Sequence, residues 1–369
     1  MSVSPRALLG ALLPLALGVL LAVIPLLSLD VPWLFNGPLD SPGTLQLLAA
    51  CLVLGGVAMS YDLLFGYTGL LSFGHALPFA LGVYIAAIAL TRWEWGMRAS
   101  LALTLAVGLL VPLGLGAVGL RVGGIAFAMV TLAFAQAGAV LVQKNPDGLS
   151  GGDEGLGLSF ERLPDFFVGV LNTKNLYWLA LGYAAFVFVV VRWAVGSSPG
   201  HVWQAIRENE QRVEVLGLHP YRFKLMVFVL SSFLATCGGA VYLLVFGGAT
   251  PAVISPNFTL TLLVMVVIGG TGTRFGALLG GVLYTYLDQR LPTLASSSEV
   301  QGLPGILRTP LSEPLFLLGT LFVLLVFFVP GGLTGLATRG PGRGLRRLEQ
   351  SLRPGGTSGG VATQPEEAA

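Results

Sequence analysis

Charged residues are scarce in this sequence, and their scarcity excludes an ordinary soluble protein. Of the 369 residues, 54% are hydrophobic and only 10% are charged, and the mean hydropathy is +0.81. A soluble chain of this length needs a much more heavily charged surface. The formal net charge of +2 provides no basic surface of the kind that binds nucleic acid. The composition therefore argues against soluble and nucleic-acid-binding proteins.

Cysteine and histidine are also rare, which leaves no candidate for a metal site, a cofactor site or a catalytic centre. Cys51 and Cys237 lie inside apolar runs without polar neighbours, so we expect two isolated buried thiols. The three histidines belong to no Glu-x-x-His or His-Glu-x-x-His pattern. An enzyme acting inside the membrane is accordingly the least favoured interpretation.

Long apolar runs dominate the rest of the chain. Many are about 20 residues long, enough for a helix to cross a hydrocarbon core of roughly 30 Å, and they lack the alternation of barrel strands. We therefore predict an all-α, polytopic membrane protein with about ten spans, of which the eighth is too short to cross alone. The expected spans are Ala7–Leu29, Thr44–Phe65, Ser72–Thr91, Ala99–Leu120, Gly123–Val142, Leu176–Val195, Leu225–Phe246, Thr259–Gly270, Phe275–Leu287 and Leu315–Val329.

Basic residues set the expected topology of these spans. If the polar segment 197–224 is cytoplasmic, most of the 20 Lys and Arg residues fall on the cytoplasmic side, and so do both termini. Residues 1–338 then form the membrane domain, and the Gly-, Pro- and Arg-rich residues 339–369 form a disordered tail near anionic lipid. The segment 143–175 becomes an external loop, which either contacts an extracytoplasmic partner or is a simple connector.

The polar segment, Ser197 to Lys224, predicts a single amphipathic helix that starts at Ser198 and ends before Gly217. Ser198 can cap this helix, Pro199 suits its first turn, Gly217 suits the residue past its end, and Pro220 cannot continue it. Apolar residues recur at three- and four-residue steps, and charged residues fill the other side. The helix either docks a soluble partner or lies on the membrane surface as a connector. The residues that we assign to docking are Ala205, Ile206, Arg207, Glu208, Asn209, Arg212, Val213, Leu216 and Gly217.

Two glycine-rich breaks interrupt the apolar runs. The first reads GYTGLLSFGHALPFALG (66–82), and the second reads VIGGTGTRFGALLGG (267–281). Bare backbone cannot face lipid, so such breaks are buried in protein or line a watery cavity. A tight turn between two spans is the alternative for the first break, but the similarity of the second favours two pseudo-symmetric halves around one pathway. The residues predicted to line this pathway are Tyr67, Thr68, Gly69, Ser72, Phe73, Gly74, His75, Gly269, Gly270, Thr271 and Gly272.

Ionisable residues are almost absent from the centres of the spans. Asp62, His75 and Asp288 lie near span ends, where we expect them to be solvated at the membrane interface. A secondary transporter driven by an ion gradient needs buried carboxylates or polar side chains for its coupling ion. That rival function therefore has little support in the sequence.

Five segments, in this order, resemble the LivM-type permeases of branched-chain amino acid ABC importers. They are SYDLLFGYTGLLSFGH (60–75), FAMVTLAFAQ (127–136), SGGDEGL (150–156), AIRENEQRVEVLG (205–217) and MVVIGGTGTRFGALLGG (265–281). The resemblance extends from about Ala49 to Leu336. Urea ABC permeases share much of the pattern, so urea or another short amide is the alternative substrate.

The resemblance implies a transport subunit of the inner, or cytoplasmic, cell membrane that is not itself an enzyme. Its expected substrates are branched-chain or other hydrophobic amino acids. Its expected partners are a second homologous permease, two cytoplasmic ATP-binding subunits, an extracytoplasmic substrate-binding protein and membrane lipid. ATP is expected to bind only those partner subunits, so this chain needs no cofactor. In that family the segment matching Ala205–Gly217 is the coupling helix, which sits in a groove of the ATPase.

Overall fold

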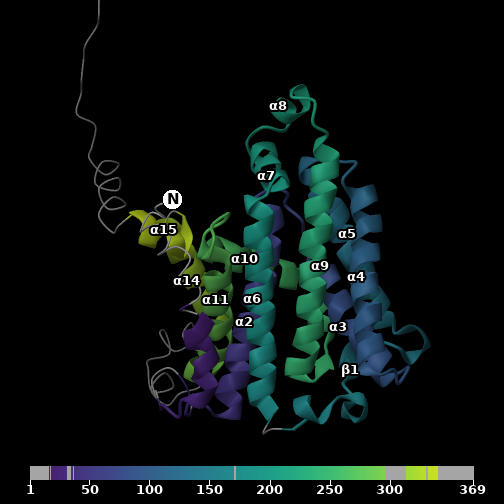
Figure 1. Ribbon diagram of the computed structural model, residues 1–369, viewed down its shortest axis with the longest axis vertical. Helices are drawn as coiled ribbons and strands as arrows, with labels where there is room; N and C mark the ends of the chain where they lie inside the picture. Colours follow the sequence, from purple (N-terminus) through teal and green to yellow (C-terminus); the bar gives the residue numbers. More distant parts are fainter. Residues whose placement is uncertain are drawn as a thin grey trace, which may run out of the picture.

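Apolar helices build the fold, as the hydrophobic runs predict (Figure 1). The computed structural model describes residues 16, 18–30, 35, 37–169, 172–295, 313–329 and 331–339. Within these residues, five helices are long and apolar enough to cross a membrane: α2 (Pro42–Phe65), α4 (Met97–Gly119), α5 (Gly124–Lys144), α6 (Thr173–Gly196) and α9 (Pro220–Phe246). The predicted class, a polytopic helical membrane protein, is confirmed.

Shorter elements complete the described part of the chain. The remaining helices are α3 (Ala76–Thr91), α7 (Ser198–Glu208), α8 (Glu210–Val215), α10 (Pro256–Gly269), α11 (Gly276–Ala295), α14 (Pro314–Phe328) and α15 (Gly332–Arg339). Single 3-10 turns are η1 (Ile24–Leu26), η2 (Pro146–Gly148), η3 (Gly152–Glu154), η4 (Phe160–Arg162), η5 (Asp165–Phe167) and η7 (Pro251–Ile254). Two short strands, β1 (Leu156–Gly157) and β2 (Gly248–Ala249), pair antiparallel.

A serine followed closely by proline starts several of these helices. Ser41 precedes α2 and accepts a hydrogen bond from the Thr44 N–H group, and Ser255 caps α10 in the same way. Proline in the first helical turn costs nothing, because the N–H groups there lack a partner within the helix. The Ser–Pro pairs therefore position both helices that lead into the glycine breaks.

Glycines let the central helices approach closely. α2 is buried along most of its length, and it crosses α11 where Gly55 meets Gly281: a Cβ atom on Gly281 would lie 2.6 Å from the Gly55 Cα atom. α3 and α9 cross in the same manner, since a Cβ atom on Gly239 would lie 2.1 Å from the Phe79 carbonyl oxygen. Small residues at helix crossings are the usual means of tight packing within membranes.

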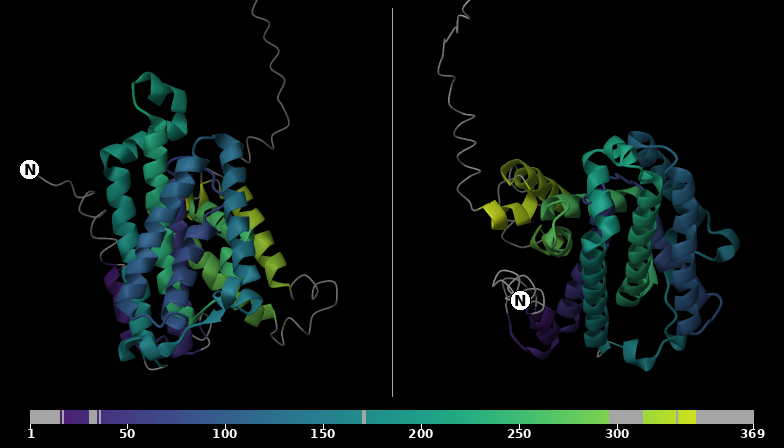
Figure 2. Two further views of the ribbon diagram at one scale, coloured as in Figure 1. Left: turned by 90° about the vertical axis from the view of Figure 1, so that its right-hand side faces the viewer. Right: turned by 45° about the horizontal axis from the view of Figure 1, so that its top comes forward.

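The two ends of the bundle differ. α7 and α8 project beyond the other helices at one end, while β1, β2 and the turns of residues 146–167 cover the opposite end (Figures 1 and 2). The segment 143–175 is thus folded onto the bundle in its described part. Span boundaries shift in places: the third predicted span begins at Ala76 instead of Ser72, and the seventh at Pro220 instead of Leu225.

Two predictions lie largely outside the described residues. Only residues 16 and 18–29 of the first predicted span are described, and of the predicted tail, 339–369, only Arg339. The pseudo-symmetry of the two halves stays a prediction, although each glycine break does join two apolar helices, α2 to α3 and α10 to α11.

Candidate functional site

The first glycine break carries the chain from the end of α2 to the start of α3. The Gly66 N–H group still donates to the Asp62 carbonyl oxygen (2.7 Å), and the Gly69 N–H group to that of Phe65 (3.1 Å). Gly69 then turns the chain with φ of +76°, a left-handed conformation that residues with a side chain rarely adopt. The helix therefore unwinds over one turn, and the chain re-enters the bundle before α3 begins at Ala76.

The second break joins α10 to α11 and is held by threonine. Gly270 and Gly272 have φ of +109° and +67°. The Thr273 hydroxyl donates to the Gly270 carbonyl oxygen (2.7 Å) and accepts from the Gly276 N–H group (3.1 Å). From α15, Thr334 donates to the Gly269 carbonyl oxygen (3.1 Å). Side-chain hydroxyls thus satisfy backbone groups that the interrupted helix leaves open.

The two breaks meet each other and the end of α7. The Asp62 carboxylate, from the last turn of α2, accepts a hydrogen bond from the Gly272 N–H group (2.9 Å). The Arg207 guanidinium donates through Nη1 to the Gly66 carbonyl oxygen, and its charge attracts Asp62. We call these four residues, Asp62, Gly66, Arg207 and Gly272, the Asp62–Arg207 junction. It joins segments separated by up to 210 residues in the sequence.

The prediction of one continuous helix from Ser198 to the residue before Gly217 is wrong. The segment forms α7 and α8, separated at Asn209, whose backbone is extended (φ −161°, ψ 105°). The Asn209 side chain accepts a hydrogen bond from the Arg212 N–H group (3.0 Å) and so caps α8. Asparagine competes with helical backbone for hydrogen bonds and is favoured at such starts. The actual cap of α7 is Ser197, which accepts from the Gly200 N–H group.

The break at Asn209 divides the apolar residues of this segment into two groups. Trp203, Ile206 and Val213 are 5% exposed or less and face the bundle. Trp203 also donates through Nε1 to the Phe223 carbonyl oxygen (3.0 Å), which fastens α7 to α9. Val215 and Leu216, by contrast, are 87% and 73% exposed. Val215 and Leu216 are therefore the apolar residues of this segment that solvent reaches most, whereas Ile206 and Val213 are buried, and the docking role stays a prediction.

Residues 43–337 match the model of one protein family, described as the permease component of branched-chain amino acid transport systems. The match covers both glycine breaks, α7 and α8. The chain belongs to this family. It is a membrane permease of branched-chain amino acid transport, with helices suited to several crossings of the membrane.

Curated relatives carry the same description. The permease is 26% identical, over 85% of its own length and 74% of the relative's, to the "High-affinity branched-chain amino acid transport system permease protein LivM" of Escherichia coli K12. The protein of that name from Salmonella typhimurium is 27% identical with the same coverage. A "Probable branched-chain amino acid transport permease protein LivM" from Methanocaldococcus jannaschii is 24% identical over 48% of this chain and 51% of its own. No solved structure matches the chain significantly.

In this permease, most of the predicted pathway residues are buried. Tyr67, Thr68, Ser72 and His75 are 8% exposed or less, and Gly74, Gly269 and Gly270 are buried too, whereas Gly69 is exposed and Phe73, Thr271 and Gly272 are half-buried. A Cβ atom on Gly74 would lie 2.4 Å from the Thr131 carbonyl oxygen of α5. The breaks are therefore closed in this conformation, and the pathway role stays a prediction.

The expectation that Asp62 and His75 are solvated is wrong, while Asp288 is indeed exposed. Asp62 is 1% exposed because α2 continues past it, so that its carboxylate faces the second break. His75 is 2% exposed: its Nε2 atom lies 3.2 Å from the Ser60 hydroxyl oxygen, and its ring packs against that of Tyr61. Both residues have partners inside the protein, as buried polar groups require.

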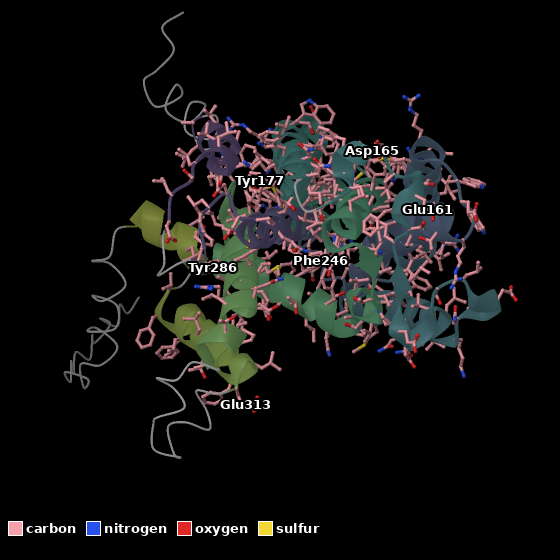
Figure 3. All side chains as sticks on the ribbon, turned by 90° about the horizontal axis from the view of Figure 1, so that it is seen from below. Glu161, Asp165, Tyr177, Phe246, Tyr286 and Glu313 are labelled. Carbon is pink, nitrogen blue, oxygen red and sulfur yellow. The ribbon has the colours of Figure 1, made fainter. Side chains whose placement is uncertain are left out.

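One cavity lies beside the first glycine break, and another lies at the opposite end of the bundle. The first, of about 20 Å³, is enough for one water molecule and is lined by Ser72 and Gly74 of the first break together with Thr131 and Ser232. The second, of about 450 Å³, opens at the end opposite α7 and α8, between α2, α6, the end of α9 and the loop 160–169. Figure 3 views this end and labels Phe246, at the end of α9, together with Glu161 and Asp165, two exposed residues of that loop.

Sequence reasoning missed three residues that fix the α7–α8 segment and the breaks. Asp62 is buried and not solvated at the membrane interface, and Trp203 is not among the predicted docking residues although it lies three residues before Ile206. Lys224, in α9, forms an ion pair with Glu210 at the start of α8. The one usable signal was the spacing of Trp203 and Ile206, because an apolar pair three apart lies on one helix face.

Proposed function

We propose that this permease is the membrane subunit of an ATP-driven importer of branched-chain amino acids. ATP would be hydrolysed by two cytoplasmic partner subunits, a second related permease would complete the membrane part, and an extracytoplasmic binding protein would deliver the substrate. The chain would lie in the inner membrane with both termini in the cytoplasm, and it would need no cofactor and perform no catalysis of its own. The observation that carries this proposal is the projecting α7–α8 segment, which is packed onto the bundle and has an exposed apolar tip.

The α7–α8 segment is suited to transmit movement from a soluble partner to the membrane helices. Its tip, Val215 and Leu216, offers apolar surface of the kind that protein partners cover. Its base is fixed by the buried Trp203 and by the Lys224–Glu210 ion pair. A partner that moves the tip therefore also moves the base, as rigid elements transmit displacement in switching proteins.

Transport in this scheme is a change of conformation. The breaks are closed here, and glycines with positive φ are positions where the chain can bend with little steric cost. Movement of α7 would open a route past the first break on one side of the membrane and close it on the other. The cavity of about 450 Å³ at the opposite end is lined by apolar side chains such as Phe167, Leu176 and Leu244, which suit an aliphatic substrate on its way in.

The choice of substrate rests on the family and on the printed names of the relatives. Both relatives that align over 85% of this chain are named for branched-chain amino acid transport. Urea or another short amide is the alternative. Binding of radiolabelled leucine or urea by the companion extracytoplasmic protein, followed by uptake into proteoliposomes, separates the two.

A charge placed on the tip tests the docking role. Val215→Asp and Leu216→Asp remove exposed apolar surface, so the permease should fold normally yet lose the ATP-hydrolysing subunits during purification. Gln211→Asp is the matched control, because it adds an acidic group to an exposed position of α8 without removing apolar area. Retention of the ATPases and full uptake by both tip variants would refute docking at this site.

A gradient-driven carrier working alone is the rival from another class. The buried Asp62 is a feature that such a carrier could use, but its carboxylate already accepts a hydrogen bond from the Gly272 N–H group and is attracted by the Arg207 charge. The purified permease alone, reconstituted into liposomes, should show no leucine uptake under a proton or sodium gradient. Gradient-driven uptake would establish the rival and remove the need for ATPases.

A further inference from the structure

Arg207 lies where its side chain contacts the first break directly. α7 is held in a fixed position by Trp203 and Ile206, which are 1% and 5% exposed. From the last turn of this helix, the Arg207 guanidinium donates to the Gly66 carbonyl oxygen. Its aliphatic stem covers Gly69, where an added Cβ atom would lie 3.1 Å from the Arg207 Cγ atom. Arg207 is exposed overall, but its side chain reaches the first break and not the tip at Val215.

The same guanidinium also faces the second break. A Cβ atom added to Gly272 would lie 2.8 Å from Arg207 Nη1, so this glycine leaves the space that the arginine occupies. Asp62 completes the arrangement, because its carboxylate accepts from the Gly272 N–H group (2.9 Å) and attracts the Arg207 charge. One arginine from α7 therefore meets both interrupted helices at once.

These contacts depend on the conformation of the breaks. An N–H···O hydrogen bond spans about 2.7–3.2 Å. A separation of α2 from the second break by a few ångströms would therefore break the Asp62–Gly272 bond, and a similar movement of α7 away from α2 would break the Arg207–Gly66 bond. A contact that exists in one state and is lost in the other is what couples two parts of a protein. Arg207 has the geometry for this, whereas Arg212, in the exposed α8, contacts neither break.

We infer that Arg207 is a positioning residue which, together with Asp62, links the position of α7 to the closed state of both glycine breaks. Its partner is this chain's own backbone and not the ATP-hydrolysing subunit. The inference rests on the proposed function, because the signal that α7 transmits would be the movement imposed by that subunit. It assigns the partner contact to the tip and the internal contact to Arg207.

Arg207→Met tests this role, since methionine keeps the apolar stem and removes every donor. The assembled complex is reconstituted into liposomes, and leucine uptake and ATP hydrolysis are measured on the same preparation. We expect the ratio of transport to hydrolysis to fall about 10- to 100-fold, the effect of losing one hydrogen bond from a charged donor. Arg207→Lys keeps one donor and should recover part of the ratio. Arg222→Met is the control and should leave the ratio unchanged, because Arg222 is an exposed arginine in the first turn of α9 and is not among the assigned docking residues.

The outcomes separate the inference from the proposed function. If the wild-type complex contains no ATP-hydrolysing subunit, or takes up no leucine with ATP, the proposed function fails before any variant is compared. If Arg207→Met alone releases the ATPases, Arg207 is a docking residue and the inference is wrong while the function stands. An unchanged ratio also overturns it. If Arg207→Met does not fold, Asp62→Asn takes its place, because it keeps an acceptor for the Gly272 N–H group and loses only the attraction to Arg207. A lowered ratio of transport to hydrolysis then supports the inference, and an unchanged ratio contradicts it.

Discussion

Replacing Gly66 by alanine tests whether the two breaks pack against each other as described. The backbone of Gly66 is helical (φ −77°, ψ −40°), so alanine meets no backbone strain there. Its Cβ atom, however, would lie 1.9 Å from Asp62 Oδ1 and 2.4 Å from the Gly272 nitrogen. The methyl group must therefore displace the carboxylate, the second break, or both. We expect Gly66→Ala to destabilise the protein through this contact alone.

The expected loss follows from two contributions. The hydrogen bond between the Asp62 carboxylate and the Gly272 N–H group involves a charged acceptor and contributes about 1.5–3 kcal/mol. Inserting a methyl group into a packed site costs about 1–3 kcal/mol. Together they amount to several kcal/mol, a large part of an ordinary domain's stability of about 5–15 kcal/mol. Gly114→Ala, on α4, is the control: no atom lies within 4 Å of its added Cβ, so it should be neutral or slightly stabilising.

The assay is a double-mutant cycle with Asp62→Ala, read as free energy of unfolding in mixed micelles at fixed detergent composition. Asp62→Ala removes the oxygen that the new methyl group would strike, so Gly66→Ala should cost less in that background than in the wild type. A coupling energy of about 1 kcal/mol or more is expected for residues in contact. Additivity within about 0.5 kcal/mol, or a Gly66→Ala variant as stable as Gly114→Ala, would refute the described packing.

Three further predictions concern the supports of the site. Trp203→Ala should lower the free energy of unfolding by about 3–5 kcal/mol and loosen α7, because this side chain is 1% exposed. Limited proteolysis should then cleave the variant within the α7–α8 segment, and an uncleaved variant would contradict the anchoring role of Trp203. Lys224→Met should cost at most about 1 kcal/mol, since its partner Glu210 is 45% exposed, and should abolish any salt dependence of stability that this pair causes. Gly239→Ala, whose Cβ would approach the Phe79 carbonyl oxygen to 2.1 Å, should lower the midpoint of thermal unfolding; an unchanged midpoint would argue against the α3–α9 crossing.

Local features of the sequence predicted the elements of the fold well. Apolar runs of spanning length located α2, α4, α5, α6 and α9, since a helix needs about 20 apolar residues to cross the membrane. Glycine with threonine marked both breaks, because exposed backbone in a membrane must find partners inside the protein. The predicted roles of Gly217 and Pro220 at helix ends are also met. Gly217 follows α8 with φ of +82°, and Pro220 lies in the first turn of α9.

Contacts between distant segments were beyond sequence reasoning. Asp62 and Gly272 lie 210 residues apart, and Arg207 and Gly66 lie 141 apart; a single sequence carries no signal that pairs them. Helical periodicity also left the buried face of α7 ambiguous, since Ala205 and Ile206 are neighbours in the sequence and only one of them is buried. Asn209 lies inside the helical pattern of residues 198–216, but a residue that can cap a helix does not by itself establish a break there.

The most direct test of the account is the side of the membrane on which the tip of the α7–α8 segment lies. Leu216→Cys places a thiol at a position that is 73% exposed, and the parental chain, with its two native cysteines, is the background control. A maleimide that cannot cross membranes should label the variant only in inverted vesicles, and bound ATP-hydrolysing subunits should slow the reaction. Labelling in right-side-out vesicles would place the tip outside the cell and contradict the proposed coupling to a cytoplasmic partner.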